Sequence, residues 1–286
     1  MTAAVTGTAR RMWTVFEPVH GVIYSGAAKP ALEEAGLRGF WRGYFAARSS
    51  PMGAVGPAPV VAAFFSFAPS VVFRALPDIW QRATPERALV ARQRAALDAL
   101  RATAGLTDET IGPLAGAVDL LVEAAAAAEH SGRVLGAANA ALPTPDEPVA
   151  RLWHAATVLR EHRGDGHVAA LVAAGISGLE ALILRAGLDL SREVLQAARG
   201  WTDEQWQAAA DGLVERGLLD AGGRTTAAGA QLYREAEDVT DRRAEGPWRA
   251  LGARAAERLV ESLATVAAAC RADSPLPNLL GLPPVG

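Results

Sequence analysis

Residues 153–167 read Trp-His-Ala-Ala-Thr-Val-Leu-Arg-Glu-His-Arg-Gly-Asp-Gly-His, and no other stretch holds so many groups that can transfer protons or bind metal. It contains three of the five histidines of the chain, His154, His162 and His167. On a helix, residues seven or eight positions apart lie on roughly one face, so His154, Glu161 and His162 share a stripe. We therefore expect a helix here that carries part of a functional site.

The boundaries of this helix are predicted from its flanking residues. A capping residue, an early proline and two acids at positions 144–148 favour a helix start there. Two glycines flank Asp165, so we expect the helix to end at Gly164. A second, buried helix then begins near residue 168, with Asp165 or Gly166 at its cap.

Residues 160–163, Arg-Glu-His-Arg, would also suit a solvated face of salt bridges. The neighbouring Trp153, Leu159 and Leu171 are apolar, which favours burial of part of the cluster. Buried polar groups need partners. The first interpretation predicts that residues 160–163 are exposed, and the second predicts that at least some of them are buried.

Two more polar stripes lie in the first fifty residues. Glu17, His20 and Tyr24 recur at i, i+3 and i+7 of a predicted helix, and Glu-x-x-His is a spacing by which helices present metal ligands. Tyr44 and Arg48 recur in the same way with Trp41, and an arginine beside a tyrosine suits an anionic or carbonyl-bearing ligand. A surface arginine stacked on an aromatic ring is the alternative.

Bulk composition predicts a globular protein without a nucleic-acid-binding surface. The 286-residue chain is half hydrophobic and has a net charge of −3, whereas phosphate neutralisation needs a concentrated positive patch. Only Lys29 among the 28 basic residues is a lysine, which indicates a high-GC genome. Cys270 is the one cysteine, which excludes an internal disulfide and fits a reducing cytoplasm.

Neither a signal peptide nor a membrane span is expected. No apolar segment follows Arg10 and Arg11, so the predicted location is cytoplasmic. Residues 49–73 carry no charge and are long enough to span a bilayer, but prolines and glycines interrupt them. We predict a loop and a buried helix there, with no membrane partner.

The last third of the chain has the order of a winged helix of the MarR type. The expected elements are three helices, a short ribbon and a final helix, at residues 176–186, 191–198, 202–217, 218–226 and 227–241. The predicted recognition helix carries four acidic residues against Arg216, which argues against DNA as a partner. We therefore expect this module to serve packing or the formation of a homodimer.

Five motifs carry a resemblance to a known family. They are Glu-Pro-Val-His at 17–20, Gly-Tyr-Phe-Ala-Ala-Arg-Ser-Ser-Pro-Met-Gly-Ala-Val at 43–55, the run at 152–167, Arg-Gly-Trp-Thr at 199–202 and Thr-Asp-Arg at 240–242. Together they resemble the SalK-like family of actinobacteria. The resemblance implies an all-helical protein with a helix-turn-helix or winged-helix part, encoded beside antibiotic-biosynthesis genes. It implies no particular reaction.

The predicted fold is all-α, with a helical N-terminal part packed on a C-terminal winged-helix-like module that has at most a short β-ribbon. The predicted segments are an N-terminal helical region at 1–143, central histidine-rich helices at 144–185, and the winged-helix-like region with C-terminal helices at 186–286.

The leading functional hypothesis is a tailoring enzyme of specialised metabolism that uses His/Glu/Tyr acid–base chemistry, of isomerase, cyclase or lyase type, in a pocket between helices. The predicted catalytic residues are His162, His167, Glu17, His20, Tyr24 and Asp165. The predicted residues for binding a small-molecule substrate are Trp41, Tyr44, Arg48, His154, Arg160 and Arg163.

Three alternatives stay open. No cofactor is predicted, but zinc or iron bound by His20, His154, His162 and His167 is a metal-assisted variant of the enzyme. A ligand-responsive winged-helix transcription regulator would explain the C-terminal pattern. A non-catalytic metabolite-binding protein would explain the polar stripes.

Overall fold

The computed structural model describes residues 7–273, 281 and 282. These residues form helices and one isolated antiparallel bridge between Leu219 and Thr225, which confirms the all-α class. They divide into two compact units, each assembled from separate segments. The first unit holds the described residues up to 55, 78–165 and those from 241 onward, and the second holds 56–77 and 166–240. The contiguous division at 143/144 and 185/186 stays a prediction.

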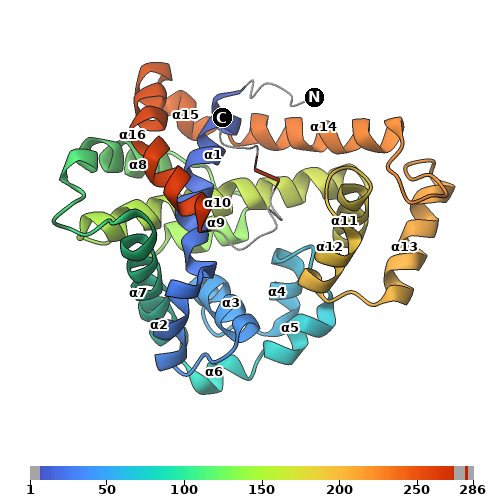
Figure 1. The fold of residues 1–286 in the computed structure, drawn as a ribbon, viewed down its shortest axis with the longest axis horizontal. Coiled ribbons are helices and arrows are strands. Elements are labelled where there is room, and N and C mark those ends of the chain that lie inside the picture. The colour runs from blue at the N-terminus through green and yellow to red at the C-terminus, as the bar shows by residue number, and fades with distance from the viewer. Residues whose placement is uncertain (1–6, 274–280, 283–286) are drawn as a thin grey trace. The chain divides into compact units, whose positions relative to one another are not determined.

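The first unit is a helical bundle in which α1 (Thr8–Gly21) packs along α16 (Ala253–Ala272) (Figure 1). Its long helix α7 (Pro85–Ala104) packs against α2 (Lys29–Glu34) and α3 (Phe40–Ser49). The other α-helices are α6 (Ile79–Arg82), α8 (Ala115–Ala126), α9 (Val134–Ala140) and α15 (Gly246–Leu251). Short 3-10 turns are η1 (Val22–Tyr24), η2 (Gly26–Ala28), η3 (Ser50–Met52) and η4 (Gly112–Leu114).

Helix α10 (Pro148–Ala173) contributes its residues up to 165 to the first unit and the rest to the second. From residue 152 to 163 every side chain is buried except that of Arg160, which is partly exposed. A helix that is buried on all sides needs apolar or internally paired residues all round it. The solvated salt-bridge face considered for residues 160–163 is therefore wrong.

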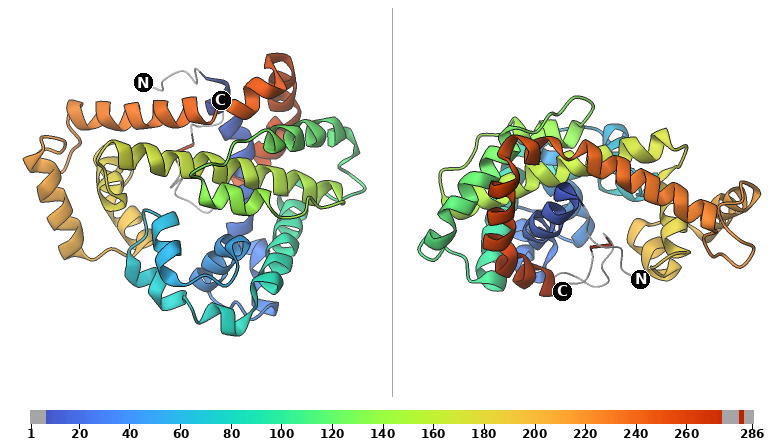
Figure 2. Two further views of the ribbon diagram at one scale, coloured as in Figure 1. Left: turned by 180° about the vertical axis from the view of Figure 1, so that it is seen from behind. Right: turned by 90° about the horizontal axis from the view of Figure 1, so that it is seen from above.

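The predicted break at Gly164 is also wrong, because α10 continues to Ala173 without interruption (Figure 2). Glycine within a helix costs roughly 1 kcal/mol relative to alanine, and the packing of a buried helix outweighs that amount. Asp165 does not cap a following helix. Its Oδ2 atom instead accepts hydrogen bonds from the backbone N–H groups of Leu135 and Gly136, at 2.8 and 2.9 Å, and so caps the start of α9.

The second unit contains a helical hairpin and the expected winged-helix order. Residues 49–73 hold two short helices rather than a loop and one buried helix, and α4 (Pro57–Ala63) and α5 (Pro69–Ala75) fall in this unit. The following elements are α11 (Gly178–Ala186), α12 (Arg192–Arg199), α13 (Asp203–Glu215) and α14 (Ala227–Arg243), whose last residues belong to the first unit.

Among the described residues, no single helix is long and apolar enough to cross a bilayer. The consecutive helices α10 and α11 meet that length and composition test only as a pair with a sharp bend between them.

Candidate functional site

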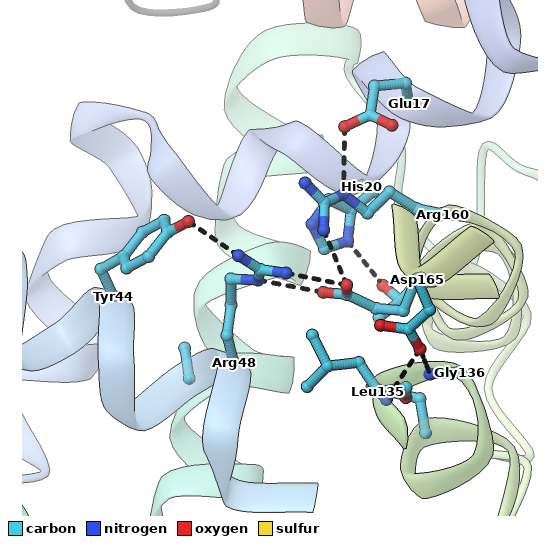
Figure 3. A network of polar contacts seen from close by, with 12 residues as sticks. Glu17, His20, Tyr44, Arg48, Leu135, Gly136, Arg160 and Asp165 are labelled. Atoms are coloured by element: carbon cyan, nitrogen blue, oxygen red, sulfur yellow. Dashed lines mark hydrogen bonds and ion pairs between the residues drawn. The ribbon is translucent and has the colours of Figure 1, made fainter. Parts of the chain in front are cut away.

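A buried ladder of charges joins three helices of the first unit (Figure 3). Arg48 of α3 donates two hydrogen bonds to the carboxylate of Glu161, at 3.0 and 2.8 Å, and a third to the Tyr44 hydroxyl, at 2.8 Å. Arg160 donates to Glu161 at 2.7 Å and to Glu17 of α1 at 3.2 Å. The predicted stripes of α1 and α3 thus meet α10.

The ladder is charge-balanced, which keeps its members ionised. Burial alone would raise the pKa of Glu161, but the charges of Arg160 and Arg48 outweigh burial and hold that pKa well below its usual range. Burial would lower the pKa of Arg48, but Glu161 together with Tyr44 and Tyr24 outweighs burial and raises that pKa. Arg48 and Glu161 therefore stay charged and hold α3 against α10.

A second chain of hydrogen bonds starts at Tyr24 and runs inward. The Thr157 hydroxyl has one hydrogen and donates it to the carbonyl oxygen of Trp153, at 2.8 Å. It must therefore accept from His20, whose Nδ1 lies 3.0 Å away. The other ring nitrogen, Nε2, is then an acceptor, 3.1 Å from the Tyr24 hydroxyl that donates to it.

The His20 and Tyr24 side chains are both neutral in this arrangement. Burial, followed by the charge of Arg160, lowers the pKa of His20 well below its usual value. Burial likewise raises the pKa of Tyr24. Neutral imidazole and neutral phenol match the tautomer that the hydrogen bonds require.

Two cavities meet at Tyr24. A pocket of about 270 Å³ is lined by residues between 23 and 47, including Tyr24, Tyr44, Ser25 and Lys29. A smaller cavity of about 10 Å³, with room for one water molecule, lies among His20, Arg48, Glu161 and Arg92. Tyr24 and Ala47 line both. The pocket therefore borders the buried polar network.

Several predicted site residues in the first unit serve other contacts. The His162 ring lies edge-on to His130, with ring centroids 5.6 Å apart. The Arg163 guanidinium lies over the Trp13 ring at 4.3 Å and donates to Asp241 at 2.9 Å. Trp41 packs against Phe40, Tyr44 and Phe45. His154 is buried in α10, and no hydrogen bond from it reaches the network.

His167 belongs to the second unit. Its Nδ1 atom lies 3.1 Å from the Thr240 hydroxyl and 3.6 Å from the Glu237 carboxylate. The four histidines considered as metal ligands, His20, His154, His162 and His167, do not form a cluster. In the part of the chain that the structure describes, no three His, Cys, Asp or Glu side chains are placed to hold one metal ion.

Two residues of the network were missed by the sequence patterns. Arg92 of α7 is buried, and its guanidinium donates to the Ala47 carbonyl oxygen at 3.1 Å and to Asn139 at 3.0 Å. It lies on the stripe of Ala88, Ala95 and Ala99, which are buried, and an arginine on an alanine stripe was the available signal. Thr157 occurs one turn after Trp153 and one turn before Glu161.

Acidification is expected to destabilise the protein between about pH 6.5 and pH 4. Burial lowers the pKa of both His154 and His162 to about 4, so the unfolded chain takes up these protons first as the pH falls. Burial raises the pKa of Asp165 to about 6, which acts in the opposite sense. Two histidines outweigh one aspartate, so urea should unfold the protein more easily at pH 5 than at pH 7. An equal or higher midpoint at pH 5 would contradict this.

Comparison with known proteins assigns nearly the whole chain to one family. Residues 9–277 match the model of a helix-turn-helix family. The chain belongs to this helix-turn-helix family. The match confirms the expected helix-turn-helix membership. No curated protein and no solved structure shows significant similarity to the chain.

Helices α12 and α13 have the order and capping expected of the helix-turn-helix predicted from the sequence. Ser191 caps α12, and Thr202 with Gln205 forms the predicted capping box at the start of α13. Gly200 makes the turn between them with φ of 75°, a conformation that favours glycine, and a Cβ there would also meet Val71.

The exposed side of this helix-turn-helix is acidic. Asp203, Glu204, Asp211 and Glu215 of α13 are all exposed. Arg192 donates a hydrogen bond of 2.7 Å to the Asp203 carboxylate, so the charge of this nearby arginine is paired with an acidic side chain.

Proposed function

We propose that this helix-turn-helix family member binds a small carbonyl-bearing molecule in the pocket at residues 23–47 and transfers a proton on it. The observation that carries the proposal is the directed hydrogen-bond chain from Tyr24 through His20 to Thr157. It ends at a hydroxyl in the pocket wall. A chain of this kind lets a proton enter and leave without a charged group facing the ligand.

Tyr44 supplies the complementary group. Its hydroxyl oxygen accepts a hydrogen bond from the Arg48 guanidinium, which strengthens the hydroxyl as a donor. A carbonyl oxygen in the pocket would therefore be polarised by the Tyr44 hydroxyl, with the charge of Arg48 behind it. Glu161 fixes Arg48 in this position and is a positioning residue.

The proposed step is an enolisation. The Tyr24 oxygen removes a proton from the carbon next to the carbonyl group while the Tyr24 hydroxyl proton moves to His20 Nε2. The electron pair of the C–H bond forms the carbon–carbon double bond of the enolate, and the π pair of the carbonyl group moves to its oxygen. Because the pKa of His20 is low, the imidazolium form gives its proton back readily. This favours return of the proton to the enolate, which exchange and isomerisation both require, over its net removal.

A non-catalytic ligand-responsive protein is the second candidate, and membership of a helix-turn-helix family favours it. The acidic surface of α13 argues against recognition of DNA by that helix. A small molecule as ligand is common to both candidates. They differ in whether the bound molecule exchanges a proton.

Deuterium exchange distinguishes these candidates. The protein is incubated in D2O with a panel of cyclic ketones and α-hydroxy ketones, and deuterium uptake is followed by NMR. Tyr24→Phe and His20→Gln are each expected to slow catalysed exchange by about 100-fold or more. Tyr233→Phe, at a tyrosine of the second unit, is the matched control and should exchange normally. Exchange that persists in His20→Gln contradicts the relay, and ligand binding without any exchange supports the second candidate.

A further inference from the structure

The small cavity beside the pocket has an excess of positive charge. Its wall carries the guanidinium groups of Arg48 and Arg92 but only one carboxylate, that of Glu161. Glu161 also binds Arg160, so its charge is shared among the arginines. Arg92 is buried, and its recorded hydrogen bonds go to a carbonyl oxygen and a side-chain amide rather than to a carboxylate.

The outer pocket offers a second cation and an unused hydroxyl. Lys29, the single lysine of a chain rich in arginine, lines the pocket, and its side chain is 67% exposed. Ser25 also lines it, and its Oγ atom is buried without a hydrogen-bond partner among the described residues. A buried hydroxyl with no partner is costly unless a ligand or water completes it.

Glu33 already pairs with Lys29 and would compete with a ligand for its charge. Its carboxylate lies 3.6 Å from the Lys29 ammonium group, beyond ordinary hydrogen-bond distance, and both side chains are exposed. Such a pair is weak and easily exchanged for another anion. A carboxylate in the pocket would compete with Glu33 for Lys29.

The rest of the pocket wall is apolar and aromatic, with Ile23, Leu32, Leu37 and Phe40 among its lining residues. A volume of about 270 Å³ is at the small end of the range for ligand pockets. Flat rings stack well on such walls.

We propose that the ligand of this pocket is a small organic acid with a flat ring, whose carboxylate is held by Lys29 and Ser25. The proposal rests on the proposed function for the location of the site. It adds the charge of the ligand and the orientation in which the acid group lies outermost and the ring extends toward Tyr24 and Tyr44.

Calorimetric titration with 4-hydroxybenzoate and with its neutral counterpart 4-hydroxybenzamide tests the proposal. The acid is expected to bind about five-fold more tightly than the amide at low salt, with the difference shrinking at high salt. Lys29→Met should abolish the difference. Glu33→Gln should increase the affinity for the acid, because it removes the competing carboxylate. Arg94→Gln, which removes an exposed arginine of α7 outside the pocket, should leave both affinities unchanged.

Equal affinities for acid and amide, or an unchanged preference in Lys29→Met, would overturn the proposal, as would failure of both probes to bind at millimolar concentration. Tight binding of the acid by a protein that catalyses no deuterium exchange would sustain this proposal and remove the catalytic one. The two can therefore fail separately.

Discussion

Replacing Glu161 with glutamine is expected to lower the free energy of unfolding by about 3–5 kcal/mol, because it removes the charge that the buried Arg48 shares with the partly exposed Arg160. Glutamine keeps the shape of the side chain but offers Arg48 and Arg160 a neutral amide in place of a carboxylate. The Arg48 guanidinium would stay buried, and its desolvation would lose its compensation, whereas Arg160 would keep Glu17.

The measurement is urea unfolding followed by circular dichroism. Glu123→Gln, at an exposed glutamate of α8, changes the net charge equally and should shift the free energy by less than about 0.5 kcal/mol. A similar small shift for Glu161→Gln would mean that the ladder is solvated in solution and does not hold α3 against α10.

Replacing Gly178 with alanine is expected to destabilise the second unit by about 3 kcal/mol or more. A Cβ at this position would lie 1.9 Å from the carbonyl oxygen of Phe65 and 2.6 Å from its carbonyl carbon. These are backbone atoms, so no side-chain rotation relieves the overlap. The first residue of α11 must therefore move away from the segment that follows α4.

Gly212→Ala is the matched control for this substitution. Gly212 lies within α13, and a Cβ there would meet nothing within 4 Å. Alanine should therefore stabilise the helix, by up to about 1 kcal/mol. Opposite signs for the two glycines, measured by thermal unfolding, are the expected result. A stabilising Gly178→Ala would show that Phe65 and α11 do not pack closely.

Local signals in the sequence predicted much of the second unit. Ser191, Thr202 and Gln205 act within one helical turn, so their capping contacts depend only on neighbouring residues. The two N-terminal stripes also converge, since Glu17, His20, Tyr44 and Arg48 all join the buried network. Side chains on one face of a helix contact the same neighbouring helix, and a spacing of three to four residues in the sequence identifies such a face.

The dense stretch at 153–167 was harder to interpret because α10 is surrounded on all sides. Glu161 faces α3, His162 faces His130, Arg163 faces Trp13, and Asp165 faces the start of α9. Four residues within one and a half turns therefore enter four different environments. Polar side chains that are close in the sequence of a helix gather at one site only when the helix has a single buried face. Arg92 was missed because its hydrogen-bond partners, Ala47 and Asn139, lie far from it in the sequence, so no local pattern connects them.

The cap that Asp165 gives to α9 also makes the stability of this short helix depend on α10. Helix α9 has seven residues and no side-chain cap of its own, and helices so short do not persist alone in water. Its stability therefore depends on α10 and on the rest of the first unit. Asn139, which accepts a hydrogen bond from Arg92, is carried by α9, so the position of Arg92 beside the pocket depends in part on the Asp165 carboxylate.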